Sequence, residues 1–509
     1  GPAPARAAAE HLRAEGLDLV PGAGGLAAAV PGAVDAWLLL LREHGTWELA
    51  DVLAHAIACA RDGHPAVARI GATVTAVADL FTRHWPSSAR LWMPHGRPPR
   101  DGEVIRNPAH ARTLERLVDA GRGARDRAGR IDAARAAWSS EVAREAVAFL
   151  RTPHRHSTGT DHAAVIEVED VAGWSASFEP AVTRDFRGTT VAKAGPWSQG
   201  PVLLQALGIL DGLPDEALDP STALGAHSVL EALKLALADR EAHYGDGTGP
   251  GVLDELLSEP YAARRRAMIG PRASTAFRPG RVGAGEPFVP PLRTAAGPAA
   301  SGVGEPTVAA TGGTRGDTCH LDVVDRWGTV VAATPSGGWL QSSPAVPELG
   351  FCLGTRLQMT WLDPASPSAL VPGRRPRTTL SPTLLLRDGV PVGALGTPGG
   401  DQQDQWQLLY LLRTLVGGLT PQEAIDAPAL HTTAVPSSFW PRTWTPAGAV
   451  VEDRLGEDVI ADLEARGHRV TRADGWSLGR LSTVGRDPAT GVLHAAADSR
   501  GAQGYAAGR

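Results

Sequence analysis

A threonine that ends a loop and opens a strand is the first residue that could do chemistry. Thr318 precedes the apolar, β-branched segments 321–325 and 329–334, and the short turn between them predicts a β-hairpin. A hydroxyl at this place can attack the carbonyl before it, so that the Asp317–Thr318 peptide becomes an ester that water opens. The α-amine freed in this way has a reference pKa of roughly 7.7 to 8.0, which suits a base near neutral pH. One residue would then supply both nucleophile and base.

The segment before Thr318 has the composition of a linker. Residues 282–317 are rich in Gly, Pro, Ala and Ser and show no apolar period, which predicts a flexible connection. We therefore expect residues 1–317 and 318–509 to be the two portions of one intertwined fold, separated into chains by self-cleavage. Taken alone, the pattern also fits a threonine that merely begins a strand.

A second candidate site lies where a strand leads into a helix. The strands expected at 383–386 and 391–395 form a hairpin, and the second leads through Gly399 and Gly400 into a Leu-rich helix from about 402 to 416. The first N–H groups of a helix have no intrahelical acceptor and attract anions. In acyl transfer this would be an oxyanion hole. A tight strand–helix turn is the plain alternative.

Two further groups of residues carry a weaker signal. Ser198 lies in a Gly-x-x-Ser-x-Gly pattern, one residue longer than the nucleophile elbow, which predicts a turn or cap residue. The segment 154–162 contains three histidines and an aspartate, but it reads as a solvated polar loop. We therefore expect no metal site, and the chemistry proposed for Thr318 requires no cofactor.

The elements that must position these residues form two groups. Helices are expected at 33–43, 47–62, 108–120, 132–149 and 202–210, and the pair Ser228 and Glu231 has the pattern of a capping box that starts a helix continuing to Arg240. Most expected strands follow Thr318, including two near 481–484 and 491–496. This arrangement predicts an α/β fold of stacked, mostly antiparallel sheets covered by helices.

Composition excludes several classes of partner. The chain has 509 residues, 43% of them hydrophobic, which is ample for a large core, and its net charge of -6 argues against nucleic acid or an anionic membrane as partner. No stretch of eighteen apolar residues is present. Three widely spaced cysteines favour a reducing, cytoplasmic location. A secreted or periplasmic location stays open, because residue 1 need not be the native start.

Over most of its length the sequence resembles the γ-glutamyltransferases, which are N-terminal nucleophile hydrolases with an αββα sandwich. The matching segments are 26–32, 44–46, 60–63, 196–200, 238–240 and 244–246 in the first half, and 318–320, 358–359, 375–383, 396–400 and 427–431 in the second. The resemblance implies that Thr318 is the nucleophile and that the preceding bond is the autoprocessing site. It also implies that the two fragments remain together as a heterodimer, with a dimer of heterodimers as a further option.

The resemblance assigns roles to further residues. Ser336 falls where the family places a hydroxyl that touches the amine of the nucleophile, and Gly399 and Gly400 fall on the oxyanion hole. Thr378 and Thr379 replace a serine pair that binds the substrate carboxylate. Each oxyanion donor could contribute roughly 2.7 to 4 kcal/mol to transition-state stabilisation.

Departures from the family pattern concern the substrate. The family aspartate that reads the substrate α-ammonium, three residues after Gln358, falls on Trp361, and an asparagine near the amine-contacting hydroxyl falls on Gly338. An aromatic ring cannot replace the charge of a carboxylate, so we expect an acyl group other than free γ-glutamyl. The family arginine that clamps the α-carboxylate would precede residue 1.

A neighbouring thiol is a rival nucleophile. Cleavage one residue later would leave Cys319 at the new N-terminus, although the register of Thr-Cys-His against the Thr-Thr-His of the family favours Thr318.

Three functions follow as hypotheses. The first is a γ-glutamyltransferase-like amidase for a larger or less polar acyl group. The second is a tailoring hydrolase of a specialised-metabolite pathway that cleaves an acyl or C–C bond next to a carbonyl. The third is an inactive homologue that serves as a binding scaffold.

Overall fold

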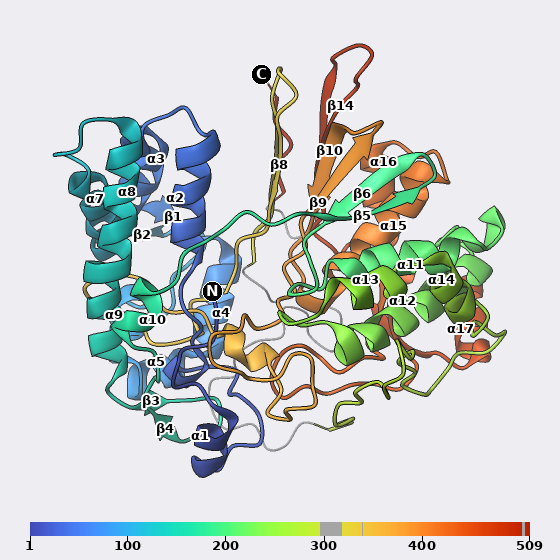
Figure 1. Cartoon of the computed structure of the whole chain (residues 1–509), viewed down its shortest axis with the longest axis horizontal. Coiled ribbons are helices and arrows are strands. Elements are labelled where there is room, and N and C mark those ends of the chain that lie inside the picture. The colour runs from blue at the N-terminus through green and yellow to red at the C-terminus, as the bar shows by residue number, and fades with distance from the viewer. Residues whose placement is uncertain (296–317, 338, 501–503, 509) are drawn as a thin grey trace.

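One antiparallel sheet joins the two portions of the chain. The structure is a computed structural model that describes residues 1–295, 318–337, 339–500 and 504–508; Asp317 and Gly338 lie outside this range. The sheet has the order β15-β14-β10-β9-β6-β5 (Figure 1). Its strands are β5 (Val182–Phe186), β6 (Thr189–Lys193), β9 (Thr383–Arg387), β10 (Val390–Gly396), β14 (Ser482–Arg486) and β15 (Leu493–Ala497). Because β5 and β6 precede Thr318 and the others follow it, neither portion holds the whole sheet.

A hairpin forms a second β layer beside this sheet. Strands β7 (Leu321–Val324) and β8 (Val330–Ala333) pair antiparallel, and both pack against β10 (Figure 1). Gly328 in the turn has a φ of 93°, a conformation that glycine adopts without steric strain. The hairpin predicted after Thr318 is therefore confirmed.

Helices and a small sheet complete this half of the molecule. Helices α11 and α15 contact the six-stranded sheet, and α12 packs between α11 and the smaller sheet β11-β12-β13, in which β12 and β13 are parallel. These elements share one hydrophobic core. The bounds are α11 (Pro201–Asp211), α12 (Ala223–His243), α13 (Pro250–Leu256), α14 (Glu259–Arg266), α15 (Gln403–Leu415), α16 (Pro421–Asp426), α17 (Glu457–Arg466), β11 (Leu430–Thr432), β12 (Gly448–Glu452) and β13 (Arg469–Ala473).

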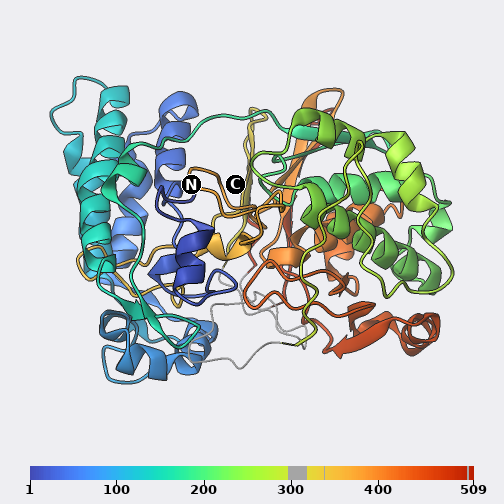
Figure 2. The same cartoon turned by 60° about the horizontal axis from the view of Figure 1, so that its bottom comes forward.

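The N-terminal helices form a separate lobe with its own core, drawn in blue and teal in Figures 1 and 2. The helix predicted after Asn107 is confirmed, because the Asn107 side chain accepts a hydrogen bond from His110 N at 3.1 Å. The lobe contains α1 (Ala9–Ala14), α2 (Ala33–His44), α3 (Leu49–Asp62), α4 (Ala68–Ala76), α5 (Ala78–Arg83), α6 (Pro86–Trp92), α7 (Pro108–Ala120), α8 (Arg127–Ala137), α9 (Ala143–Leu150) and α10 (Val168–Ala172), with short pairs β1 (His64–Pro65) with β2 (Val104–Ile105) and β3 (His154–Arg155) with β4 (Asp161–His162).

Two local predictions were wrong. The long central helix begins at Ala223 with Thr222 as its cap, and Ser228 instead donates to the carbonyl of Leu224 inside the helix. The segment 154–162 is not a solvated loop, since β3 and β4 pair and His156 is buried and accepts from Leu26 N at 2.9 Å. At the helix start a nearer cap, Thr222, competes with Ser228, whereas at segment 154–162 a distant contact with Leu26 decides the outcome.

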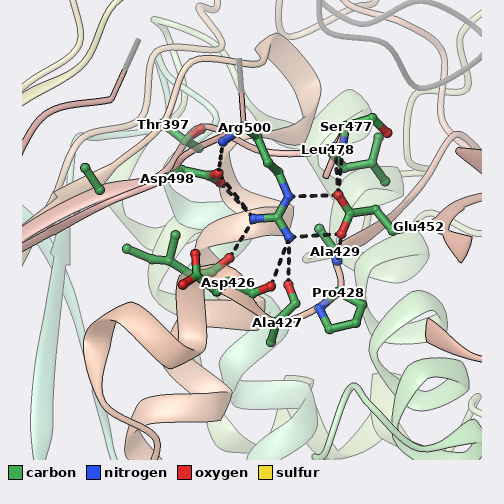
Figure 3. Close-up of polar contacts among 12 residues, drawn as sticks. Thr397, Asp426, Ala427, Pro428, Ala429, Glu452, Ser477, Leu478, Asp498 and Arg500 are labelled. Carbon is green, nitrogen blue, oxygen red and sulfur yellow. Dashed lines mark hydrogen bonds and ion pairs between the residues drawn. The ribbon is translucent and has the colours of Figure 1, made fainter. Parts of the chain in front are cut away.

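A buried arginine ties the C-terminal segment to the core. Arg500 donates from Nε and Nη2 to the two carboxylate oxygens of Glu452, at 2.8 and 2.9 Å (Figure 3). Its Nη1 donates to Asp498 and to the carbonyl of Ile425, and Nη2 also reaches the carbonyl of Ala427 at 2.9 Å. Every nitrogen of this guanidinium therefore has an acceptor, and we call Arg500, Glu452 and Asp498 the Arg500 clasp.

Candidate active site

Thr318 lies at the start of the hairpin with its hydroxyl facing that of Ser336. Thr318 Oγ1 and Ser336 Oγ are 2.8 Å apart, and Thr318 is only 5% exposed. Both residues lie just outside the paired ends of their strands, where β7 begins and β8 has ended, so the antiparallel register brings them together. The structure thus joins two residues that are eighteen positions apart in the sequence.

A hydrogen-bond network around His320 supports the same end of the hairpin. His320 Nε2 is 2.7 Å from Asp322 Oδ1, and His320 Nδ1 is 2.7 Å from Thr334 Oγ1. An ionised carboxylate only accepts, so in the neutral imidazole Nε2 carries the proton and Nδ1 accepts from the hydroxyl. The other oxygen of Asp322 accepts from Ser482 Oγ at 2.8 Å, which links the hairpin to β14. This network holds the backbone two residues away from Thr318.

The same histidine brings the hairpin to the end of β10. A Cβ placed on Gly396, the last residue of β10, would lie 2.3 Å from the His320 ring, so only glycine allows this approach. Three residues further on begins the Gly399–Gly400 turn. The hairpin with Thr318 and the segment that leads to the predicted oxyanion loop therefore meet at the end of β10.

Gly399 and Gly400 adopt backbone conformations that other residues avoid. Their φ values are 137° and 59°, and a Cβ on Gly399 would lie 2.5 Å from the Trp406 ring. They precede α15, whose first N–H groups lack intrahelical acceptors. The carbonyl of Gly400 is held by the Gln199 side chain at 3.0 Å, which fixes the orientation of the turn. The use of this turn as an anion site and oxyanion hole stays a prediction.

The predicted carboxylate-binding threonines lie beside this turn. The backbone of Thr378 pairs with residues 197 and 199, and its Oγ1 accepts from Leu380 N at 3.2 Å. Thr379 Oγ1 is buried and has no hydrogen-bond partner among the described residues.

Ser198 lies in a turn, where its Oγ accepts a hydrogen bond from Gly200 N at 3.0 Å. The prediction of a turn residue is confirmed.

The other predicted substrate residues are engaged within the protein. Gln358 Nε2 donates to the carbonyl of Gly22, and Gln358 Oε1 accepts from Trp440 N, both at 3.2 Å. Trp361 is 2% exposed, and its Nε1 donates to Glu241 Oε2 at 3.1 Å. The predictions for Gly338 and for the bond after Asp317 fall outside the described residues.

The rival thiol occupies a different environment. Cys319 is exposed, and its Sγ lies 3.8 Å from the carbonyl of Pro335. Thr318 instead is buried against a second hydroxyl. Which of the two is the nucleophile stays a prediction.

One cluster of the described residues has the composition of a metal site. His227, Glu231 and His468 are buried with their ligand atoms within 4.8 Å of one another. However, Glu231 already forms ion pairs with Lys234 at 2.6 Å and Arg278 at 2.9 Å. A divalent cation would have to face both of these positive charges, so we assign the cluster a structural role.

A set of buried charges that the sequence did not reveal lies next to the Gly399–Gly400 turn. Arg240, Glu241, Arg377, Asp401 and Arg442 form connected ion pairs, which we call the Glu241 cluster. The available signal was that α12 has apolar residues on every side, so its charged residues had to find buried partners.

Comparison with known proteins agrees with this arrangement. The family model described as gamma-glutamyltranspeptidase matches residues 1–508. The chain belongs to the γ-glutamyltranspeptidase family. It is therefore an enzyme with the mixed α/β fold of the N-terminal nucleophile hydrolases. In the described part of the chain, no helix is both long and apolar enough to cross a bilayer.

Three relatives illustrate how similar the chain is to known proteins. LmbA2991HD is 51% identical with a TM-score of 0.94, over 100% of this chain and 87% of that one. The cephalosporin acylase from Bacillus halodurans is 27% identical with a TM-score of 0.80, over 100% and 83%. The acylase ACY 1 proenzyme of Pseudomonas sp. (strain SE83) is 25% identical over 454 residues, 88% of this chain and 70% of its own length.

Proposed function

We propose that self-cleavage before Thr318 produces a two-fragment acyl hydrolase in which Thr318 is the nucleophile. The observation that carries this proposal is the 2.8 Å contact between the hydroxyls of Thr318 and Ser336 at the braced end of the hairpin. Relatives such as the acylase ACY 1 are named proenzymes, which supports processing into two chains.

In the proposed mechanism the freed α-amine of Thr318 takes the proton from Oγ1, which attacks the carbonyl carbon of the substrate amide. The N–H groups of Gly399 and Gly400 would stabilise the oxyanion, because they precede α15 with no intrahelical acceptor. The protonated amine of the enzyme then gives its proton to the leaving group as the C–N bond breaks. Water attacks the resulting ester by the same route and releases the acid.

The acyl group is proposed to differ from free γ-glutamyl. Trp361 stands where the family reads the substrate ammonium with an aspartate, and its indole is turned to Glu241 inside the protein. The ordinary partner of the α-ammonium is therefore absent from this position. An acyl group without an ammonium suits the site better.

Self-cleavage can be tested with a denaturing gel and N-terminal sequencing. The wild type should yield a small fragment that begins at Thr318, and Thr318→Ala should remain a single chain. Thr318→Ser keeps a hydroxyl and should still be processed, while Cys319→Ala is the control that leaves the proposed nucleophile in place. If Thr318→Ala is still cut at this bond, the assignment is wrong.

A further inference from the structure

One glutamine of the first portion of the chain reaches the Gly399–Gly400 turn of the second portion. Gln199 lies in the turn before α11 and has no exposed surface. Its backbone N–H donates to the carbonyl of Thr378 at 2.9 Å, and its own carbonyl accepts from Val202 N at 2.9 Å. The backbone of Gln199 is therefore fixed both to α11 and to the segment that contains Thr378 and Thr379.

The side chain of Gln199 bridges a donor and an acceptor that cannot exchange roles. Its Oε1 accepts from Arg240 Nη1 at 2.8 Å, and its Nε2 donates to the carbonyl of Gly400 at 3.0 Å. A guanidinium only donates and a backbone carbonyl only accepts, so the amide has one possible orientation between them. An ionised glutamate here could accept from Arg240 but could not donate to Gly400. An amide is therefore the group that this position requires.

The carbonyls of the turn are held on the side of the helix that follows it. The carbonyl of Gly399 accepts from Gln402 N at 3.1 Å, and that of Gly400 accepts from Gln403 N as well as from Gln199. In a planar trans peptide the C=O and the N–H point in opposite directions. The N–H groups that follow these two carbonyls therefore point away from the first turn of α15, and that of Gly400 is one of the two predicted oxyanion donors.

Such a turn needs contacts from outside to keep one conformation. Glycine has more accessible backbone conformations than any other residue, and Gly399 and Gly400 are consecutive and both have a positive φ. An oxyanion donor is effective when it is already oriented before the reaction begins. Because the hydrogen bond from Gln199 comes from outside α15, it holds the turn against the rest of the fold.

We propose that Gln199 is a positioning residue, which Arg240 aligns and which holds the Gly399–Gly400 turn in the orientation that acyl transfer requires. It touches neither the substrate nor the reacting atoms and acts through the carbonyl of Gly400. After self-cleavage before Thr318, Gln199 and Gly400 belong to different fragments, so the small fragment depends on the large one for the orientation of this turn. The inference deepens the proposed function and rests on it, because it concerns the turn that would hold the oxyanion.

A second buried glutamine offers a matched control. Gln205 lies within α11, where its Nε2 donates to Asp239 Oδ2 at 3.1 Å and its Oε1 accepts from the hydroxyl of Tyr244. Gln199→Met and Gln205→Met each remove one donated and one accepted side-chain hydrogen bond at a buried site and nearly keep the size of the side chain. Gln199→Glu is sharper, because it keeps the contact with Arg240 and removes only the donor to Gly400.

Hydrolysis of acetyl, butyryl, phenylacetyl and γ-glutamyl 4-nitroanilides measures the effect. With the best of these anilides, Gln199→Met and Gln199→Glu should each lower kcat at least tenfold and change KM less than threefold, because the turn acts on the transition state. Gln205→Met should keep kcat within threefold of the wild type, although it should lower the midpoint of urea unfolding about as much as Gln199→Met. An unchanged kcat in both Gln199 variants, or equal losses of kcat at the two glutamines, would overturn the proposal.

Crystal structures separate failure of this role from failure of the hydrolase. In Gln199→Glu the new carboxylate and the carbonyl of Gly400 repel each other, so this carbonyl should turn away from its position in the wild type, whereas in Gln205→Met it should stay. A turn that is unchanged in both Gln199 variants overturns the positioning role, whatever their activity. A displaced turn, together with no cleavage of any anilide by the wild type, would keep the role and contradict the acyl hydrolase. If Gln199→Glu does not fold or is not processed, Gln199→Met provides the same comparison.

Discussion

The Arg500 clasp and the Glu241 cluster are two buried arginine networks that differ in how completely their donors are used. Arg500 is held by the carboxylates of Glu452 and Asp498 and by backbone carbonyls. Each of its three guanidinium nitrogens donates to at least one of these oxygens. In the Glu241 cluster one carboxylate serves three arginines, and Arg377 and Arg442 each keep two nitrogens that donate no hydrogen bond within the described residues.

The two networks differ in whether every buried charge has a full set of partners. A buried charge is tolerated when its partners are complete, as in the clasp that fixes the C-terminal segment. An incomplete set of partners costs stability. The cluster beside Gly400 has such an incomplete set, and the clasp does not.

The largest expected effect comes from removing the shared carboxylate. Glu241→Gln would leave three arginines with Asp401 alone, and we expect a loss of about 5 kcal/mol in the free energy of unfolding. Urea unfolding of the variant in a Thr318→Ala background, where the chain stays in one piece, measures this loss. A loss under about 1 kcal/mol would show that the arginines are compensated elsewhere.

Removing an arginine should have unequal effects in the two networks. Arg500→Met breaks a complete set of contacts and is expected to cost about 3 kcal/mol, whereas Arg377→Met balances the charge of its cluster and should cost about 1 kcal/mol or less. The same urea experiment compares them, with each variant as the control for the other. Equal losses in the free energy of unfolding would show that the Arg500 clasp and the Glu241 cluster do not differ in this way.

A further expected effect, smaller than the losses at Glu241 and Arg500, is a pH dependence of the clasp. Burial raises the pKa of Asp498 to about 6, although Arg500 opposes the shift, while the pKa of Glu241 is lowered because its arginines outweigh its burial. A carboxyl whose pKa is raised by folding binds a proton more tightly in the folded state, so stability falls as pH rises from about 4 to 6. We expect the free energy of unfolding to fall by an amount on the order of 2 kcal/mol over this range, and we expect Asp498→Asn to abolish this fall.

Thermal melting of the wild type and of Asp498→Asn between pH 4 and 7 measures this contribution. The melting temperature of the variant relative to the wild type should increase through this range. Glu241→Gln is the comparison, since a lowered pKa in the folded state contributes no change between pH 6 and 7. If the melting temperatures of the wild type and of Asp498→Asn change with pH in parallel, the pKa of Asp498 is not raised.

The sequence predicted the elements that depend on local signals. The hairpin after Thr318 and the strand that leads into Gly399 follow from alternation, turn glycines and the helix after them. The role of Thr318 needed more, because a threonine at the start of a strand has no distinctive neighbours. Only the motifs spread along the chain supported it.

The charged network escaped prediction for a physical reason. Arg377 and Glu241 are 136 positions apart, and their contact depends on how an irregular segment passes the end of α12. Charged residues in a helix ordinarily mark its solvent face, so only the apolar residues on every side of α12 indicated that Glu241 is buried, and nothing indicated its partners. The same limit applies to Trp361, whose orientation toward Glu241 no pattern in the sequence could reveal.

The most direct test of the central claim is the mass of the small fragment during turnover. Acid quenching in the first turnovers with the best anilide, followed by intact mass spectrometry, should show the fragment beginning at Thr318 with the mass of one acyl group added. Peptide mapping should place that group on Thr318. An adduct on Cys319, or turnover with no adduct on Thr318 and undiminished activity of Thr318→Ala, would contradict the account.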